Sequence, residues 1–337
     1  MFIKTAPANG VSRSPFATKA VVHVLDRFDN IVESGIGSNF TIRAFSLDGG
    51  TTITGNEEPA VAGVARFEIL ALGGKVNTNY TISFEAEEDE NIGLVSASNV
   101  TVTHGTAAKI EFVTPPSSLV TDPSSQDYGF WTRTGDPLAT KAVIEVQDLD
   151  GNRVLTSNRR ITATLSKPSG ALHTKDRLES NEVNAVNGRA TFDDLRVVAR
   201  PGESYFLEFN SRGDFTAIQS GVLKFRHGEA HSLEIVTDPA ESSASQAFTR
   251  TGDVLATPPV VRILDFDGNL ATEVSGDRVT AEMVSGGGEL VVGVNEDQPQ
   301  FTAGLLGGEA TLSSLAVIAE PDVPQKLKFV AQIGTKS

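Results

Sequence analysis

The chain has 337 residues, with 28 lysines and arginines against 43 aspartates and glutamates, which gives a formal net charge of −15. This excess of negative charge disfavours a surface that binds the phosphates of nucleic acid. The sequence contains no cysteine, so disulfides, thiolate metal sites and cysteine nucleophiles are excluded. No apolar run approaches the roughly 18 residues of a membrane helix, so we expect no direct membrane insertion of this segment.

The chain contains three copies of one unit. The segment Val24–Asn30 recurs at intervals of about 120 residues, as Val146–Asn152 and as Ile263–Asn269. Further matches in the same order are Ala17–Val21 with Ala139–Val143 and Ala256–Val260, Ala65–Phe67 with Ala190–Phe192 and Ala310–Leu312, and Tyr80–Phe84 with Tyr205–Phe209. The repeat predicts three domains, at residues 1–105, 106–228 and 229–337.

Apolar and polar side chains alternate within the repeated segments, as they do in strands with one buried face. In the second copy, Ala142, Ile144 and Val146 are predicted to face a core, with Glu145 on the outer face. Each copy contains about seven short strands separated by Gly, Asn, Asp and Pro turns, and we find no convincing amphipathic helix. The predicted fold class is therefore all-β.

Copies of roughly 105 to 125 residues with this density of strands have the size of an immunoglobulin-like β-sandwich. Near His104–Gly105 and His227–Gly228, the last strand of one copy runs almost directly into the first strand of the next. Linkers this short do not behave as flexible coil. We therefore expect three tandem sandwiches in a semi-rigid rod on the order of 100 Å long.

The third copy departs from the pattern at its end. After Leu327–Phe329 it has only Val330–Ser337, whereas the second copy continues through Ser220–Phe225. We expect the third sandwich to lack its last strand, which leaves an unpaired edge over an open core. Either the sequence is an excerpt of a longer repeat protein, which we favour, or a neighbouring chain donates the strand.

Several segments of the second copy carry a resemblance to a known class of protein. They are Thr134–Thr140, Val146–Asn152, Asn187–Phe192, Leu195 and Tyr205–Phe209. Together they resemble the tandem immunoglobulin-like repeats of large surface proteins, with a layout similar to the invasin and intimin type. The resemblance implies an extracellular, cell-surface location and other copies or neighbouring repeats as partners, and it says little about a ligand. The first residues, Met1–Lys4, lack the features of a signal peptide, so we expect any export signal to lie outside this sequence.

The recurring acidic segment has two interpretations. Oxygen-bearing side chains on alternate residues resemble the start of a calcium loop, with ligands Asp148, Asp150 and Asn152 in the second copy and Asp265, Asp267 and Asn269 in the third. No downstream glutamate completes the pattern, and the first copy is shifted to Asp26, Asp29 and Asn30. The alternative is a hairpin turn in which these residues cap the backbone, and we favour it. Calcium is the only cofactor that the sequence suggests.

Two further patterns are candidate surface sites. Asn39, Asn79 and Asn99 begin glycosylation sequons, and each is predicted to point outward because the residue after it points inward. Arg212-Gly213-Asp214 falls in a predicted end loop of the kind that can present an adhesion ligand.

Histidines and aromatic residues also gather at particular places. His227 and His231 could form a metal pair, although solvated linker histidines are the favoured interpretation, and His104 occupies the position equivalent to His227. Tyr128, Phe130 and Trp131 lie in an insert of the second copy; they could stack on carbohydrate, and we favour packing against the preceding domain.

No catalytic motif is present, so we expect a protein that is not an enzyme. The leading hypothesis is an extracellular structural repeat segment, either a spacer or a subunit of a cell-surface appendage or fibre. The alternative is an adhesin that binds a receptor or glycan through its end loops or the aromatic insert.

Overall fold

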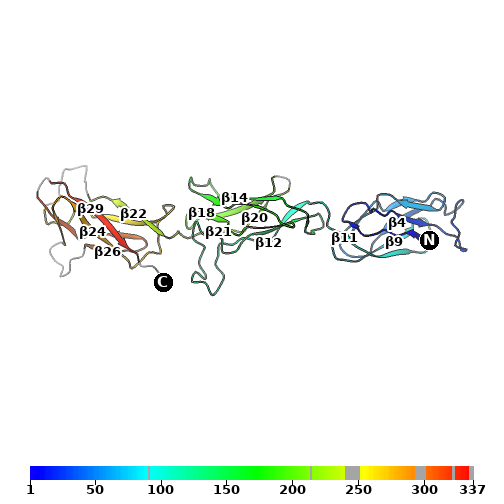
Figure 1. Ribbon diagram of the computed structural model, residues 1–337, viewed down its shortest axis with the longest axis horizontal. Helices are drawn as coiled ribbons and strands as arrows, with labels where there is room; N and C mark the ends of the chain where they lie inside the picture. Colours follow the sequence, from blue (N-terminus) through cyan, green and yellow to red (C-terminus); the bar gives the residue numbers. More distant parts are fainter. Residues whose placement is uncertain (90–91, 213–214, 240–250, 293–300, 321–322, 334–337) are drawn as a thin grey trace.

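The computed structural model describes residues 1–89, 92–212, 215–239, 251–292, 301–320 and 323–333. In these residues the protein is all-β, with strands and no α-helix, as predicted. The strands form three groups that follow one another in a row (Figure 1). We name the groups unit 1, unit 2 and unit 3; their strands lie within residues 2–103, 109–224 and 230–332. No helix that could cross a membrane is found in the described part of the chain.

Unit 1 contains a sheet of order β1-β3-β7, a sheet of order β10-β9-β4-β6, and the pairs β5-β8 and β2-β11. Its strands are β1 (Phe2–Thr5), β2 (Gly10–Val11), β3 (Ala20–His23), β4 (Thr41–Phe45), β5 (Thr52–Thr54), β6 (Glu57–Pro59), β7 (Val64–Phe67), β8 (Ala71–Gly73), β9 (Tyr80–Ala86), β10 (Val95–Val100) and β11 (Val102–Thr103). The inward side chains form one core, in which the rings of Phe67 and Phe84 lie 5.3 Å apart.

Unit 2 repeats this arrangement with sheets β12-β13-β17 and β16-β14-β19-β20, the pair β15-β18, and β21 beside β19. Its strands are β12 (Lys109–Thr114), β13 (Val143–Gln147), β14 (Arg160–Ser166), β15 (Arg177–Glu179), β16 (Glu182–Asn184), β17 (Arg189–Thr191), β18 (Arg196–Val198), β19 (Ser204–Asn210), β20 (Ile218–Gln219) and β21 (Leu223–Lys224). The predicted alternation is confirmed, since Ala142, Ile144 and Val146 are fully buried and Glu145 is not.

Unit 3 has sheets β22-β23-β27 and β26-β24-β29 and the pair β25-β28. Its strands are β22 (Ala230–Thr237), β23 (Val260–Asp265), β24 (Arg278–Ser285), β25 (Glu289–Val292), β26 (Thr302–Gly304), β27 (Glu309–Thr311), β28 (Leu315–Ile318) and β29 (Lys326–Gln332). In the described residues nothing pairs with the outer edge of β29, where unit 2 has β20 and β21 beside β19. Leu327 and Phe329 are accordingly only half-buried, whereas Leu207 and Phe209 in β19 are fully buried.

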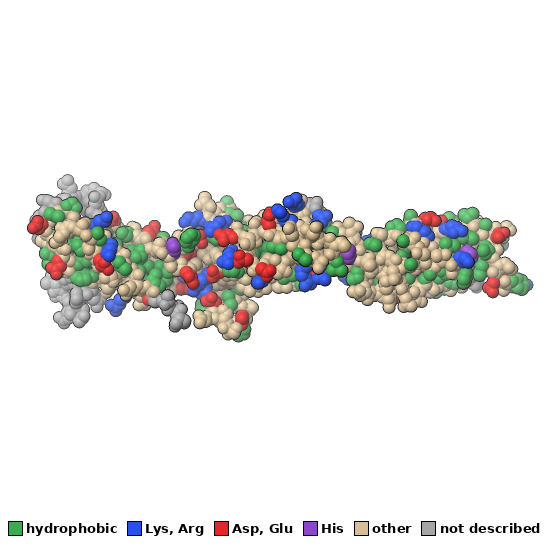
Figure 2. All heavy atoms as spheres, viewed as in Figure 1, with side chains coloured by type: hydrophobic (Ala, Val, Ile, Leu, Met, Phe, Trp, Pro, Cys, Tyr) green, Lys and Arg blue, Asp and Glu red, His purple; other side chains and the backbone are tan. Residues whose placement is uncertain are grey.

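The three units have separate hydrophobic cores. Each core is built from alternate residues of short strands, and burying each large side chain contributes roughly 1.5 to 3 kcal/mol. Figure 2 shows an elongated surface on which lysine, arginine, aspartate and glutamate side chains intermingle over the middle unit, with histidines at the narrow places between the units. The contacts between neighbouring units at these narrow places form the candidate site.

Candidate site at the junctions between units

The acidic segment of unit 2 forms a closed turn directly after β13. One carboxylate oxygen of Asp148, Oδ1, accepts hydrogen bonds from the backbone N–H groups of Asp150 at 3.0 Å and of Asn152 at 2.8 Å. The other, Oδ2, accepts one from Nδ2 of Asn152 at 3.0 Å. Gly151 supplies the positive φ of 76° that the turn requires. The carboxylate therefore caps the turn from inside, as in the hairpin-turn interpretation.

Unit 3 repeats this turn after β23. Oδ1 of Asp265 accepts from the N–H groups of Asp267 at 3.0 Å and Asn269 at 2.8 Å, and Oδ2 accepts from Nδ2 of Asn269 at 3.0 Å. Gly268 has a φ of 83°. The segment thus specifies the same local structure in both places.

Unit 1 has the same turn with different residues. Asp26 Oδ1 accepts from the N–H groups of Phe28 at 2.8 Å and Asn30 at 2.9 Å. Asp29 adopts a φ of 64°, so it occupies the glycine position, and Phe28 occupies the position of Asp150. One turn geometry with a different middle residue therefore accounts for the first copy, in which the polar residues Asp26, Asp29 and Asn30 are spaced differently. These hydrogen bonds lower the pKa of Asp26.

Each linker glycine binds the turn of the following unit. The backbone N–H of Gly105 donates to Asp148 Oδ2 at 2.7 Å, and that of Gly228 donates to Asp265 Oδ2 at 2.8 Å. Asp148 and Asp265 are only 2% and 1% exposed, whereas Asp26 is exposed. Each of these two buried carboxylates therefore closes its own turn and also binds the linker that leads into its unit.

At the first junction, the turn of unit 2 docks onto unit 1. The Asp150 carboxylate accepts from the Ser12 hydroxyl at 2.6 Å and pairs with the Arg13 guanidinium at 2.7 Å. Burial alone would raise the pKa of Asp150, but the hydrogen bonds from Arg13 and Ser12 outweigh it and lower that pKa. The Asn152 side chain donates to the Gly74 carbonyl at 2.9 Å and accepts from the Val76 N–H at 3.0 Å.

At the second junction, a lysine and an arginine of unit 2 contact the turn of unit 3. Lys175 Nζ donates to the Asp267 carbonyl at 2.6 Å, and Arg177 pairs with the Asp267 carboxylate at 3.3 Å. A hollow of about 590 Å³ lies here, lined among others by Lys175, Val198, Asp267 and Leu270. Basic groups of one unit thus hold the acidic turn of the next at both junctions.

Two tyrosines position the loops that receive these turns. In unit 1 the Lys75 N–H donates to the Tyr80 hydroxyl at 2.6 Å, and in unit 2 the Arg200 N–H donates to the Tyr205 hydroxyl at 3.0 Å. Burial raises the pKa of Tyr205. The Tyr205 hydroxyl also donates to Asp176 at 3.2 Å, beside Lys175. Sequence reasoning noted the tyrosines only as repeat landmarks, although their shared position was a signal for this role.

His104 and His227 lie at the junctions, and the expectation of a solvated linker histidine is wrong for His227, which is buried. His227 is 5% exposed; its Nδ1 lies 2.6 Å from the Gly228 carbonyl, and its Nε2 accepts from the Glu273 N–H at 3.0 Å. His104 makes the equivalent contact with Gly105 at 3.2 Å. The ring of His231 instead packs edge-on against Phe266, with centroids 5.1 Å apart.

The calcium hypothesis remains a prediction. The described residues contain no group of three or more His, Cys, Asp or Glu side chains that could hold a metal ion. In the turns, the oxygens of Asp148 and Asp265 accept N–H groups, and the carboxylates of Asp150 and Asp267 pair with arginines. This geometry favours the turn interpretation over a cation site.

The sequon asparagines Asn39, Asn79 and Asn99 are all exposed, and Tyr80 and Val100, which follow two of them, are buried. Their glycosylation remains a prediction.

In the adhesion tripeptide, Arg212 is exposed with a φ of 49°. Gly213 and Asp214 lie outside the described residues.

The aromatic insert is a hairpin that projects from the side of unit 2 (Figure 1). Tyr128, Phe130 and Trp131 are 56%, 54% and 38% exposed. Arg226 lies over the Phe130 ring at 5.5 Å and also pairs with Asp127. The same guanidinium pairs with Glu273 of unit 3 at 3.0 Å. The expected packing against the preceding domain is therefore wrong, because the insert is tied to the junction with the following unit.

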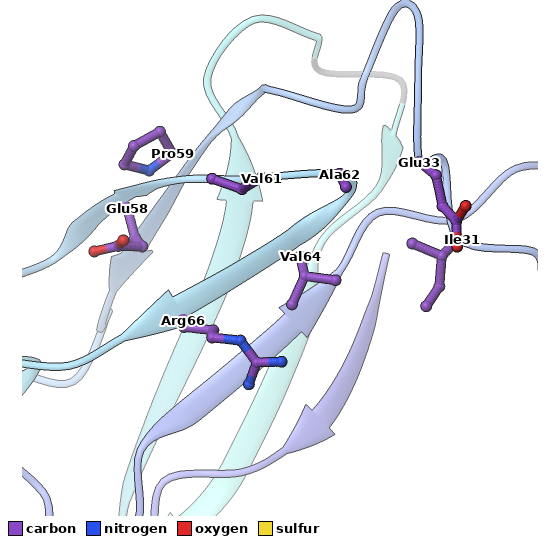
Figure 3. A pocket seen from close by; sticks show the side chains of 8 residues that line it. All are labelled: Ile31, Glu33, Glu58, Pro59, Val61, Ala62, Val64 and Arg66. Carbon is purple, nitrogen blue, oxygen red and sulfur yellow. The ribbon is translucent and has the colours of Figure 1, made fainter.

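Unit 1 also has a shallow hollow of about 430 Å³ on its outer surface (Figure 3). Ile31, Val61 and Val64 form its apolar part, and Glu58 and Arg66 lie on its rim. At the corresponding place in unit 2, Arg189 and Arg153 pair with Glu145 at 2.7 and 3.6 Å. The hollow is open in unit 1 because apolar side chains replace this ionic group.

No protein-family model and no curated protein matches the chain. Among solved structures, a β-glycosidase from Bacteroides vulgatus is 8% identical, with a TM-score of 0.26, over 66% of this chain and 24% of that chain. A β-glucuronidase from Parabacteroides merdae is 13% identical, with a TM-score of 0.22, over 66% of this chain and 25% of that chain. The chain spans about a quarter of these enzymes, and likenesses this weak carry no argument about its fold or activity.

Proposed function

We propose that the protein is a non-enzymatic structural segment of an extracellular cell-surface appendage or fibre, in which three immunoglobulin-like β-sandwich domains form a semi-rigid rod. The repeated sheet orders of units 1 and 2 and the separate core of each unit support the sandwich assignment. The absence of a catalytic motif in the sequence agrees with a structural role, and other copies or neighbouring repeats are the proposed partners.

One observation carries this proposal: the same acidic turn is docked at both junctions. A flexible tether needs no buried carboxylate, yet Asp148 and Asp265 are buried and bind the linker glycines. Removing such an acceptor leaves buried N–H groups unpaired, which costs about 1 to 3 kcal/mol. Free bending would break the bonds that cross the junctions, from Ser12 to Asp150 and from Lys175 to Asp267, so the units are expected to keep their relative orientation.

Small-angle X-ray scattering of the monomeric chain tests rigidity. The wild type should have a maximum dimension on the order of 100 Å and a rod-like cross-section. Changing both Asp150→Ala and Asp267→Ala removes the ionic contacts between units but leaves both turns closed, so the double variant should sample bent shapes. Phe28→Ala, at the equivalent place in unit 1, is the matched control and should scatter as the wild type does. A wild type as flexible as the double variant would contradict the proposal.

The exposed aromatic hairpin favours a second candidate, an adhesin that binds glycans. Trp131 is the only tryptophan in the chain, so its fluorescence reports directly on the hairpin. Titration with soluble oligosaccharides should shift the emission if sugar rings stack there, and Phe130→Ala should weaken the effect. An unchanged spectrum across a panel of neutral and acidic oligosaccharides would leave only the spacer role.

A further inference from the structure

We infer that the hollow at the second junction is a binding site for a neutral sugar, a mono- or disaccharide, which bridges units 2 and 3. The hollow has a volume of about 590 Å³ and is lined by residues of both units. Binding sites for small molecules have volumes of about 300 to 1,000 Å³ and often lie between domains. The site is argued from the junction alone, and only its effect on bending rests on the proposed rod function.

The first junction shows the contacts that close the corresponding gap. The Asn152 side chain of unit 2 donates to the Gly74 carbonyl of unit 1 at 2.9 Å and accepts from the Val76 N–H at 3.0 Å. Lys75 Nζ donates to the Gly151 carbonyl at 3.2 Å. Asn152 is accordingly only 4% exposed. Hydrogen bonds between the units therefore hold this part of the first junction closed.

A proline removes one of these contacts at the second junction. The hydroxyl of Tyr205 accepts the Arg200 N–H at 3.0 Å. Lys75 stands in the same relation to the corresponding tyrosine of unit 1, so the two loops match residue by residue. Pro201 therefore takes the place of Val76, and proline has no backbone N–H to donate. The second junction cannot form the bond from this loop to the asparagine of the next turn.

The partners of the missing contacts are still present and line the hollow. In the described residues, the Asn269 side chain bonds only to its own turn, where Nδ2 donates to Asp265 at 3.0 Å. No bond joins it to the carbonyl of Ala199, a residue that is 3% exposed. The exposed Arg200 has no ion pair within the described part of the chain. An amide, a carbonyl and a guanidinium therefore line the hollow without the contacts that their counterparts make at the first junction.

These groups fit the hydroxyls of a sugar. The Asn269 amide both donates and accepts, the Ala199 carbonyl accepts and the Arg200 guanidinium donates, and a hydroxyl can be donor or acceptor. Val198 and Leu270 form an apolar part of the lining. The C–H groups of a sugar ring can pack against them and remove this apolar surface from water, which water molecules in the hollow cannot do.

The charges around the hollow favour a neutral ligand. The lining has charged side chains of both signs, with a histidine beside them: Lys175, Arg200, Asp176, Glu203, Asp267 and His173. Two of the carboxylates already have basic partners, since Glu203 pairs with Lys167 and Asp267 pairs with Arg177. A charged ligand would meet like charges as well as opposite ones, whereas hydroxyls form hydrogen bonds with charged groups of either sign.

A sugar in the hollow contacts both units at once. Ala199 and Arg200 belong to unit 2, and Asn269 and Leu270 belong to unit 3. The ligand therefore binds the arrangement in which the two units are aligned and not a bent one. Such a ligand shifts the junction toward the straight arrangement.

Nuclear magnetic resonance of the isotope-labelled full chain tests binding. The probes are glucose, galactose, mannose, N-acetylglucosamine, lactose and maltose, and at least one should cause saturable shifts of the amide signals of Asn269, Leu270 and Arg200. Pro201→Val restores the missing N–H, so this variant should show no saturable shift with that sugar. Arg200→Gln should weaken binding about tenfold, because it removes a charged donor. Arg212→Gln, which changes an exposed arginine elsewhere in unit 2, should bind as the wild type does.

Three results would overturn the site. They are the absence of saturable shifts at the junction with every one of these sugars, equal binding by the Pro201→Val chain, and shifts confined to the aromatic hairpin.

Fluorescence energy transfer between dyes on units 2 and 3 tests the bridging. The sugar should narrow the distribution of distances in the wild type, and the Pro201→Val chain should have a narrow distribution without sugar. An unchanged distribution in a wild type that binds the sugar would overturn the bridging. Failure of the rod proposal would appear instead as free bending at the first junction as well, and it would leave the binding result standing.

Discussion

At the residue scale, the position of one aspartate decides how much it stabilises the protein. Asp148 and Asp26 cap the same turn, but Asp148 is buried and also binds the linker at Gly105, whereas Asp26 is exposed. A hydrogen bond lost in water is replaced by solvent, while a buried donor left without an acceptor is not. The two aspartates therefore form a natural comparison within one chain.

We predict that Asp148→Ala lowers the free energy of unfolding of unit 2 by about 2 to 4 kcal/mol, because several buried N–H groups lose their acceptor. Asp26→Ala is the control and should destabilise unit 1 much less, because water replaces the carboxylate. Urea unfolding, monitored by amide hydrogen exchange in each unit, measures both losses of unfolding free energy. Equal losses would show that burial of the turn does not matter.

The first junction should respond to acid. In the folded protein the pKa of Asp150 lies below the ordinary aspartate value of 3.8, because the side chains of Arg13 and Ser12 bind its carboxylate. Its ion pair with Arg13 therefore contributes stability that is fully present well above pH 3.8 and is lost as the pH falls through the lower, folded pKa. Asp150→Asn removes this titration.

We therefore expect the wild type to bend at the first junction once the pH falls below the folded pKa of Asp150. Fluorescence energy transfer between dyes on units 1 and 2 measures this bending. The Asp150→Asn chain should show the same moderate flexibility at neutral and acid pH. A wild-type signal independent of pH would contradict the assigned ion pair.

At the scale of single elements, the acidic turn closes without a bound cation. Its closure uses backbone N–H donors, and its outward carboxylates bind Arg13 or Arg177. We therefore expect that millimolar calcium leaves the melting temperature unchanged. A ligand that bound only the folded state would raise the melting temperature. A rise that Asp150→Ala abolished would establish the calcium hypothesis instead.

The edge strand β29 should be the weak element of unit 3. Its side chains Leu327 and Phe329 are half-buried, whereas Leu207 and Phe209 at the equivalent places in β19 are fully buried. Half-burial forfeits part of the roughly 1.5 to 3 kcal/mol that each such side chain can contribute. Amide hydrogen exchange of the isolated chain should therefore be much faster in β29 than in β19. Equal protection of the two strands would contradict an open third unit.

At the scale of the whole molecule, the two junctions are held by different means. The first uses buried hydrogen bonds of Asn152 to the backbone of unit 1. At the second junction Arg226 and His227 bind Glu273, but Lys175 is exposed, Arg177 is 44% exposed, and a hollow of about 590 Å³ lies beside them. Surface ion pairs contribute little and weaken with salt.

The rod should therefore bend more at the second junction than at the first. In electron micrographs of single chains, the distribution of angles between units 2 and 3 should be broader than that between units 1 and 2, and it should broaden further in high salt. Arg226→Ala, which removes the pairing with Glu273, should have the same effect as salt. A broader distribution at the first junction would reverse this assignment.

The sequence by itself determined the three copies, the all-β class and the faces of the strands, because alternation and turn residues act within a few positions of the chain. It also indicated that Asp148 and Asp265 lie in turns. Only the tertiary structure decided that these turns are docking sites and that the aromatic insert is tied to the following unit through Arg226. The bond from Ser12 to Asp150 joins residues 138 positions apart. The same turn motif is exposed at Asp26 and buried at Asp148, so burial depends on the neighbouring unit and not on the local sequence.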